Sequence, residues 1–267
     1  YMNGIVLNPI GRVLNSIEEP QEMPLGGVDS TIEIFPQFYD ALLHIESNSH
    51  LWVLSWFHKS NRNVVQAVPG RVNPNLPPRG VFALRSPNRP NPIGLSLTRL
   101  EKREGRFLSV QGLDVLNHTQ VLDVKPYVEN DCCLSPQTPY LKAVSREARF
   151  FYLSRLARTH HQEECPDFNL AVRMALIAEE FLGQLNSSFV LLEVKGGPCL
   201  ADCLQGISRA RFSNPPRFIF YPDSGAAEST WIRQDRWIKI KARHAWLDAA
   251  GPENDDDLFE LTYSPSV

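Results

Sequence analysis

The residues best suited to chemistry lie in one proline-rich stretch, residues 80–94, with the sequence GVFALRSPNRPNPIG. Its three prolines fix φ and bias each preceding residue towards an extended backbone, which predicts a stiff, non-helical loop. The loop carries two guanidinium groups, Arg85 and Arg89, and two amide side chains, Asn88 and Asn91. Donors held at fixed positions suit a small anionic ligand, although most proline-rich stretches only connect two elements.

The segments around this loop are expected to be strands. Residues 81–84 are apolar, which predicts a buried strand, and residues 95–100 alternate as a second strand would. Other short strands are expected at 5–15, 31–35, 50–57, 107–115 and 121–124. Many short strands with little helix predict an antiparallel β-barrel or sandwich, so we expect a mostly β N-terminal domain.

The composition changes after Tyr140. Apolar residues at helical spacing predict helices at 145–158 and 168–185, and strands are expected at 189–194, 217–221 and 237–242. The second half is therefore expected to be α+β. We predict one domain over residues 1–142, a second over 143–250, and an acidic, solvated end over 251–267.

Composition limits the classes of protein to which the chain can belong. It has 267 residues, 43% of them apolar, and no apolar run long enough for a membrane span. Five cysteines argue against a disulfide framework and favour a reducing, cytoplasmic setting. Residues 1–142 carry 13 basic and 13 acidic side chains, so composition shows no basic excess of the kind that nucleic-acid-binding domains usually have.

Residues 80–94 closely resemble the signature of the TrmO (TsaA-like) family of S-adenosylmethionine-dependent tRNA methyltransferases. Two further segments resemble that family, SHLWVLSWFHKS at 49–60 and QGLDVLNHTQVLDVKPY at 111–127, and the loop at 20–25 stands where the family has a Pro-Arg-Gln segment. This chain lacks the Arg-Gln pair there, and has Asn-His at 117–118 where Asp-Gly is common. The resemblance covers residues 4–142 and implies a β-barrel that binds S-adenosyl-L-methionine.

The same resemblance implies which residues bind the cofactor. Arg85 would pair with its carboxylate, and Asp114 would accept a hydrogen bond from a ribose hydroxyl. The implied set is Pro24, Leu25, His58, Lys59, Arg85, Leu95, Gln111, Gly112, Leu113 and Asp114. The residues themselves also permit structural roles, because Arg85 could bridge two strands and Asp114 could cap a turn.

The chemistry expected at this site is methyl transfer. A sulfonium methyl group is already electrophilic, so the protein must position the reactants more than form covalent bonds to them. The matching residues on the catalytic side are His58, Lys125 and Tyr127, although His58 could be a strand-end histidine and Tyr127 could fill the rim of the core. No strong general base is required, because an exocyclic adenine amine loses its proton late.

Two segments of the second half resemble an FmdE-like domain: HQEECPDFNLAVRMALIAEEFL at 161–182 and GGPCLADCLQGISRARF at 196–212. Glu163 and Asp167 replace a histidine and a glycine of the family pattern. The resemblance implies a metal such as zinc, and the matching side chains form an adequate donor set: His161, Glu163, Cys165 and Cys199. A cysteine is also often only a small buried apolar residue, so a packing role stays open.

The function that these resemblances imply is N6 methylation of a threonylcarbamoyl-modified adenosine beside the anticodon of tRNA. Two alternatives stay open. The chain could transfer a group from the same cofactor to a small-molecule or metal-bound acceptor held by the second domain, or it could be a non-catalytic sensor of S-adenosylmethionine and a metal. The first family also implies a homodimer.

Overall fold

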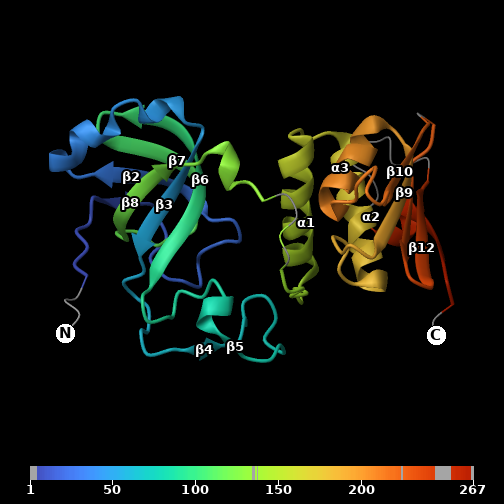
Figure 1. The fold of residues 1–267 in the computed structure, drawn as a ribbon, viewed down its shortest axis with the longest axis horizontal. Helices are drawn as coiled ribbons and strands as arrows, with labels where there is room; N and C mark the ends of the chain where they lie inside the picture. The colour runs from blue at the N-terminus through green and yellow to red at the C-terminus, as the bar shows by residue number, and fades with distance from the viewer. Residues whose placement is uncertain (1–4, 134–135, 137, 224, 244–253, 266–267) are drawn as a thin grey trace. The chain divides into compact units, whose positions relative to one another are not determined.

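The structure is a computed structural model that describes residues 5–133, 136, 138–223, 225–243 and 254–265. The chain divides into two compact units between Cys133 and Leu134 (Figure 1). The expected boundary, after residue 142, lies close to this division.

The N-terminal unit is a closed β-barrel, which confirms the predicted antiparallel fold. Its strands follow the order β1-β2-β7-β6-β3-β8 around the barrel, each antiparallel to its neighbours. The strands are β1 (Gly11–Leu14), β2 (Val28–Ile34), β3 (His50–Trp56), β6 (Ile93–Glu104), β7 (Phe107–Leu113) and β8 (Gln120–Pro126). Alternating side chains fill the interior, where Val13, Ile32, Val53 and Leu108 are fully buried.

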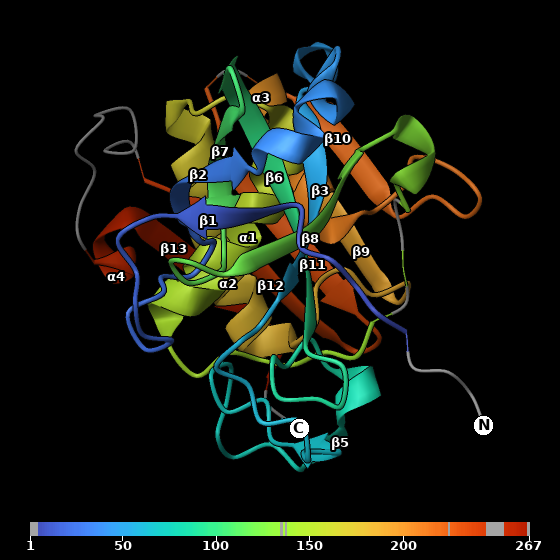
Figure 2. The same cartoon turned by 90° about the vertical axis from the view of Figure 1, so that its left-hand side faces the viewer.

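Three connections emerge at one end of this barrel, since successive antiparallel strands reverse direction. They are the β1–β2 loop, the β7–β8 loop, and residues 57–92 between β3 and β6 (Figure 2). The last of these, here called the β3–β6 connection, contains β4 (Gln66–Ala67), β5 (Arg79–Gly80) and the 3-10 turn η3 (Val81–Ala83). Further 3-10 turns are η1 (Pro36–Leu42), η2 (Ile45–Ser47) and η4 (Glu129–Asp131).

The buried strand expected at residues 81–84 is wrong. These residues form η3, with Val81 buried and Phe82 87% exposed. The Arg89 guanidinium donates to the carbonyls of Val81 and Leu84 and so uses acceptors that a sheet would need. The neighbouring expectation, at residues 95–100, is confirmed within β6.

The C-terminal unit contains three long helices on a five-stranded sheet, as the α+β expectation required. The helices α2 (Pro166–Leu182) and α3 (Pro198–Ser208) pack on one face of the sheet, and α1 (Arg146–His161) packs on these two helices, on their side away from the sheet (Figure 1). The sheet order is β10-β9-β11-β12-β13, from β9 (Val190–Gly196), β10 (Phe218–Pro222), β11 (Glu228–Arg233), β12 (Arg236–Ala242) and β13 (Phe259–Tyr263). Trp231, Leu204 and Met174 lie fully buried between the two layers.

The end of the chain differs from the acidic, solvated segment that we expected. Residues 255–263 form the short helix α4 (Asp255–Leu258) and the strand β13, which pairs with β12. Phe259 is only 2% exposed, and Asp255 lies 2.7 Å from the Arg173 guanidinium. The acidic residues are followed by Leu258 and Phe259, whose buried side chains attach this segment to the sheet.

Among the residues that the structure describes, no helix is both long enough and apolar enough to span a membrane.

Candidate functional site

Two of the segments expected to bind the cofactor touch each other at the loop end of the barrel. A Cβ added to Gly27 would lie 2.5 Å from the backbone of Leu113, and one added to Gly112 would lie 3.2 Å from the carbonyl oxygen of Gly26. All three glycines, at 26, 27 and 112, have left-handed φ values, which glycine adopts without strain. The loop that carries Pro24 and Leu25 therefore packs directly on the end of β7.

Side-chain hydrogen bonds extend this group across β6. The Ser96 hydroxyl donates to the Asp114 carboxylate, and the Arg85 guanidinium donates to the backbone carbonyl of Leu95. Leu95 and Ser96 are adjacent in β6, so Arg85 and Asp114 are anchored to neighbouring positions of one strand. Arg85 and Asp114 are both exposed and keep polar atoms for a ligand.

Lys59 and His58 lie in the turn that follows β3, at the same end of the barrel. The Lys59 ammonium donates to the Glu18 carbonyl at 2.8 Å and to the Glu19 carboxylate at 2.7 Å. These contacts tie the start of the β3–β6 connection to the β1–β2 loop. His58 is exposed beside it.

The other two expected catalytic residues lie towards the opposite end of the barrel. Lys125 pairs with Trp52 across β8 and β3, and the Tyr127 amide donates to the His50 carbonyl at 3.0 Å. His58 is six residues beyond Trp52, which along a strand corresponds to about 20 Å. A single copy of the chain therefore does not bring His58, Lys125 and Tyr127 together. Burial and the neighbouring Cys132 raise the pKa of Tyr127.

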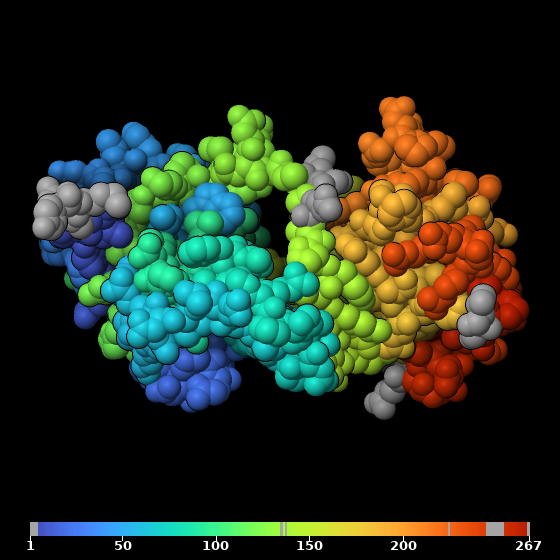
Figure 3. Space-filling model, turned by 60° about the horizontal axis from the view of Figure 1, so that its bottom comes forward, coloured from blue at the N-terminus to red at the C-terminus, as the bar shows by residue number. Residues whose placement is uncertain are grey.

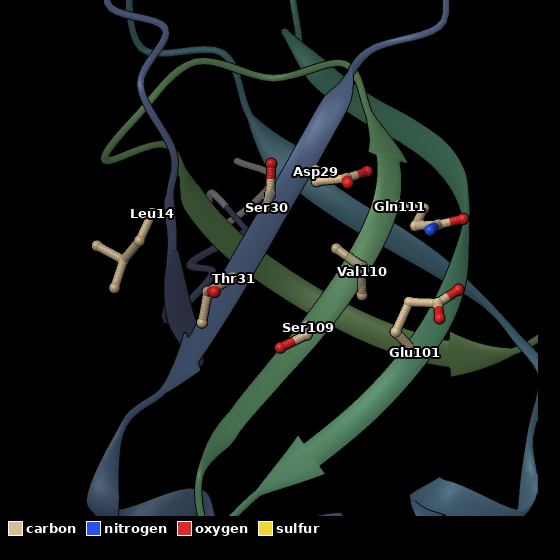
Figure 4. Close-up of a pocket in the computed structure, with 8 residues that line it drawn as sticks. All are labelled: Leu14, Asp29, Ser30, Thr31, Glu101, Ser109, Val110 and Gln111. Carbon is tan, nitrogen blue, oxygen red and sulfur yellow. The ribbon is translucent and has the colours of Figure 1, made fainter.

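A hollow of about 270 Å³ lies on the wall of the barrel (Figure 4). Gln111 lines it, and it is the one residue of the expected cofactor set that does. The other lining residues are Leu14, Asp29, Ser30, Thr31, Glu101, Ser109 and Val110. The hollow is slightly smaller than the range of about 300–1,000 Å³ that is typical of small-molecule sites.

In the C-terminal unit, three of the four expected metal ligands converge. The Cys165 sulfur lies 3.4 Å from His161 Nε2, and the ligand atoms of His161, Cys165 and Cys199 all lie within 4.8 Å of one another. The three residues come from different helix ends, because His161 ends α1, Cys165 caps α2 and Cys199 lies in the first turn of α3. Glu163 is exposed and does not belong to this group.

Asp202 orients the histidine of this cluster. Its carboxylate lies 2.8 Å from His161 Nδ1 and 3.1 Å from His160 Nε2. An Nδ1–H bond to a carboxylate leaves the Nε2 lone pair of His161 facing Cys165, the arrangement that metal-binding histidines usually have. Asp202 follows Cys199 by three residues, and helical spacing puts the two on one face of α3, so the pattern around 199–205 contained the signal for this residue.

Burial governs the ionisation of the groups around the cluster. It raises the pKa of the Cys199 thiol, with a further contribution from Cys165, and raises the pKa of Cys203 to about 12. Burial also raises the pKa of Asp167, against the opposing effects of the Leu200 amide and His161. Without a cation these thiols therefore stay protonated at neutral pH.

Sequence reasoning missed two features that organise the barrel site. One is the hydrogen bond from Ser96 to Asp114, and the other is the close backbone contact between the glycine pair at 26–27 and the end of β7. The glycine pair predicts a turn, but nothing in the sequence indicates that the turn packs on Gly112 and Leu113, 86 residues further along the chain. Ser96 looks like an ordinary inward-facing residue of an alternating strand.

Comparison with known proteins agrees with this picture. Residues 17–132 match the family model of the tRNA-methyltransferase O N-terminal domain. A probable S-adenosyl-L-methionine-binding protein of Archaeoglobus fulgidus is 36% identical over 217 residues, which cover 79% of this chain and 58% of that protein. The chain thus spans a little over half the length of this relative.

Two other relatives match less than half of this chain. A probable S-adenosyl-L-methionine-binding protein of Methanothermobacter thermautotrophicus is 40% identical over 47% of this chain and 92% of its own. The human tRNA (adenine(37)-N6)-methyltransferase is 42% identical over 36% of this chain and 22% of its own. A crystal structure of TrmO from Pseudomonas aeruginosa aligns over 90% of this chain and 93% of that chain, with 20% identity and a TM-score of 0.44. The chain belongs to the family of proteins that share the tRNA-methyltransferase O N-terminal domain.

Proposed function

We propose that the chain is an S-adenosylmethionine-dependent methyltransferase that acts on N6 of the threonylcarbamoyl-modified adenosine at tRNA position 37. The names of the human enzyme and of the archaeal relatives support this activity and this cofactor. The observation that carries it is the continuous group at the loop end of the barrel, where Arg85, Leu95 and Asp114 are joined by hydrogen bonds through β6.

The residues present fit the cofactor. Arg85 spends one N–H on the Leu95 carbonyl and keeps donors for a carboxylate, and Asp114 keeps an oxygen for a ribose hydroxyl. Gly112 and Leu113 would contact the ligand through their backbone, because Leu113 is fully buried. Pro24, Leu25, Gln111, His58 and Lys59 would complete the binding surface. The cofactor supplies the methyl group, and these residues orient it.

We further propose a homodimer. Leu95 and Leu97 are 48% and 41% exposed on the outer side of β6, beside Arg85, and their coverage by a second copy would exclude water from the cofactor. The barrel hollow is also small for a complete site. A second copy is the simplest source for the groups at the far end of the barrel, Lys125 and Tyr127, if they act at the site.

For the C-terminal unit we propose an FmdE-like domain that binds zinc through His161, Cys165 and Cys199. The 3.4 Å between Cys165 Sγ and His161 Nε2 is close to the roughly 3.6 Å expected between sulfur and nitrogen ligands of a tetrahedral zinc ion. Zinc would act as a Lewis acid and would keep both thiols ionised. Free thiols at all five cysteines suit a cytoplasmic setting, which is part of the same proposal.

One observation favours the alternative of a small-molecule acceptor. Three protein ligands, instead of four, leave a coordination position of the kind that catalytic zinc sites keep for a substrate or water. Methyl transfer to a small acceptor held there would then require the two units to act together.

The test is methyl transfer from labelled S-adenosylmethionine to tRNA with and without the threonylcarbamoyl group. The proposal predicts label in the modified tRNA only, recovered as an N6-methylated nucleoside. Cofactor binding by calorimetry, without label in either tRNA, would instead point to the small-molecule enzyme or to a sensor. Absence of cofactor binding would overturn the whole proposal.

A further inference from the structure

The β3–β6 connection has an unusual charge for this chain. Residues 57–92 contain six basic side chains and no aspartate or glutamate, whereas the whole chain has a net charge of −3. The basic residues are Lys59, Arg62, Arg71, Arg79, Arg85 and Arg89. The connection covers much of the N-terminal unit in the view of Figure 3, where it is coloured cyan and teal. A domain without net charge therefore has one connection with only basic charged residues.

The fold orients these cations without neutralising them. Four of the arginines donate to backbone carbonyls, namely Arg62 to Pro90 at 3.0 Å, Arg71 to Met23, Arg85 to Leu95, and Arg89 to Val81 and Leu84. A carbonyl accepts one N–H but carries no net charge, and a guanidinium has five N–H donors. Within the connection, which the structure describes completely, only Lys59 forms a salt bridge. Charge and donors therefore remain for an anionic ligand.

An exposed aromatic ring lies among these arginines. Phe82 is 87% exposed at the centre of η3. Arg89 donates to the carbonyls on either side of it, those of Val81 and Leu84, so the turn is fixed while the ring stays in water. The rigid support leaves both faces of the ring open to a stacking partner.

We propose that the β3–β6 connection is the RNA-binding surface of the protein, in which the exposed Arg62 and Arg71 contact phosphates and Phe82 stacks on an unpaired base. Guanidinium groups match phosphate geometry, and base stacking on an aromatic ring is the usual way in which proteins hold single-stranded RNA. The combination favours a single-stranded loop over a duplex, whose bases are already stacked. This inference rests on the proposed function and assigns the site of contact with its substrate.

The experiment measures binding of a fluorescent RNA hairpin with a single-stranded loop to the full chain between about 50 and 200 mM salt. The variants are Phe82→Ala and the double variant Arg62→Gln/Arg71→Gln, which avoid the residues assigned to the cofactor. Lys102→Gln is the matched control, because it removes one exposed charge from β6, outside the connection. Calorimetry with S-adenosylmethionine shows whether each variant keeps its cofactor site.

The inference predicts that Phe82→Ala weakens hairpin binding about 10- to 100-fold. The double variant should lower the slope of log K against log salt by about 1.4, or 0.7 for each lost phosphate contact, and Lys102→Gln should leave the affinity unchanged. Equal affinities in all variants would overturn the inference even if methyl transfer is found. Equal binding of duplex RNA or of phosphatidylserine vesicles would also overturn it. Loop-dependent RNA binding without methyl transfer would support this surface while rejecting the proposed reaction.

Discussion

Arginines have different partners in two regions of this molecule, the β3–β6 connection and the helices α1 and α2. In the β3–β6 connection they donate to carbonyl oxygens and keep their charge. In the helices α1 and α2 of the C-terminal unit, four arginines instead face carboxylates: Arg146 and Arg173 contact Asp255, Arg149 contacts Glu180 at 2.5 Å, and Arg158 contacts Glu164. In the first region the guanidinium groups are fixed without a carboxylate partner, and in the second they join neighbouring helices.

The difference teaches that the partner of an arginine says more about function than the arginine itself. A guanidinium bound to a carboxylate is largely neutralised and offers little to a passing anion. A guanidinium bound to a carbonyl is immobilised at little electrostatic cost, which is what a binding site needs. If this distinction is correct, removal of arginines in the two regions should affect different measurements.

Arg149→Ala should have the largest effect, and that effect should be on stability. Arg149 is buried, lies 3.7 Å from Glu179 and bonds Glu180, so its loss leaves a buried carboxylate without its cation. Breaking a buried pair typically costs about 3–5 kcal/mol. Burial already raises the pKa of Glu179, and protonation relieves part of the cost, so we expect about 3 kcal/mol.

Urea denaturation followed by hydrogen exchange in the α1 and α2 peptides measures this loss. Arg158→Ala is the control, because both members of that pair are exposed and the expected change is within about 1 kcal/mol. The barrel peptides should be unaffected in both variants. A similar loss in the two variants would contradict the role of burial.

Arg85→Ala should affect the cofactor and not stability. A hydrogen bond to a charged group contributes about 1.5–3 kcal/mol, so the affinity for S-adenosylmethionine should fall about 10- to 100-fold by calorimetry. Arg103→Ala is the matched control. Like Arg85, Arg103 donates to a backbone carbonyl, that of Leu42. Unlike Arg85, it also pairs with a carboxylate, that of Glu46, and it lies near the other end of β6. Arg85→Lys should recover part of the affinity. A drop of equal size in Arg103→Ala would contradict the distinction.

Alternation and helical spacing were sufficient to predict most of the fold. The barrel strands β3, β6, β7 and β8 and the helices α1 and α2 lie where the patterns indicated, because each packs its apolar face against the core of its own unit. The exceptions depend on contacts that the sequence pattern does not show. Residues 81–84 have the apolar pattern of a strand, but Arg89 donates to their carbonyls and stabilises a turn. The acidic end has the composition of a solvated segment, but Phe259 is buried against the sheet.

The candidate sites could be predicted only in part. Similarity to known families pointed to Arg85, Asp114, His161, Cys165 and Cys199, and the structure brings the last three together. Glu163 could not be excluded from sequence, since its exposure depends on how the chain leaves α1. The positive connection was also hidden, because acids elsewhere in residues 1–142 balance its charge in any composition count.

Asp202→Asn should weaken zinc binding by about 10- to 100-fold, the usual effect of removing the partner of a metal-bound histidine. Asparagine keeps the shape of the side chain but removes the charge that faces His161 and His160. A competition titration against a chelator measures the affinity, with Asp223→Asn, at the Lys195 pair, as the control. Unchanged zinc affinity in Asp202→Asn would contradict its place beside the metal. RNA binding by the connection should be unaffected, which keeps the two regions independent.

The smallest expected effect concerns Glu33, where two barrel arginines face a carboxylate as the arginines of α1 and α2 do. Glu33 accepts from Arg12 at 2.6 Å and from Arg106 at 2.5 Å, and these hydrogen bonds lower its pKa. Because its folded pKa lies below the unfolded value, Glu33 stabilises the barrel above about pH 4.5, and this contribution is lost as the pH falls through the folded pKa. Glu33→Gln should therefore reduce the loss of barrel stability at acid pH, measured by hydrogen exchange in β1 and β2. The control Glu104→Gln, at an exposed residue, should leave this loss unchanged.

Glu179 should act with the opposite sign, because its raised pKa makes the C-terminal unit less stable as the pH rises above about 4.5. The same change of stability with pH in both units would contradict this difference, in which arginine hydrogen bonds lower the pKa of Glu33 and burial raises the pKa of Glu179.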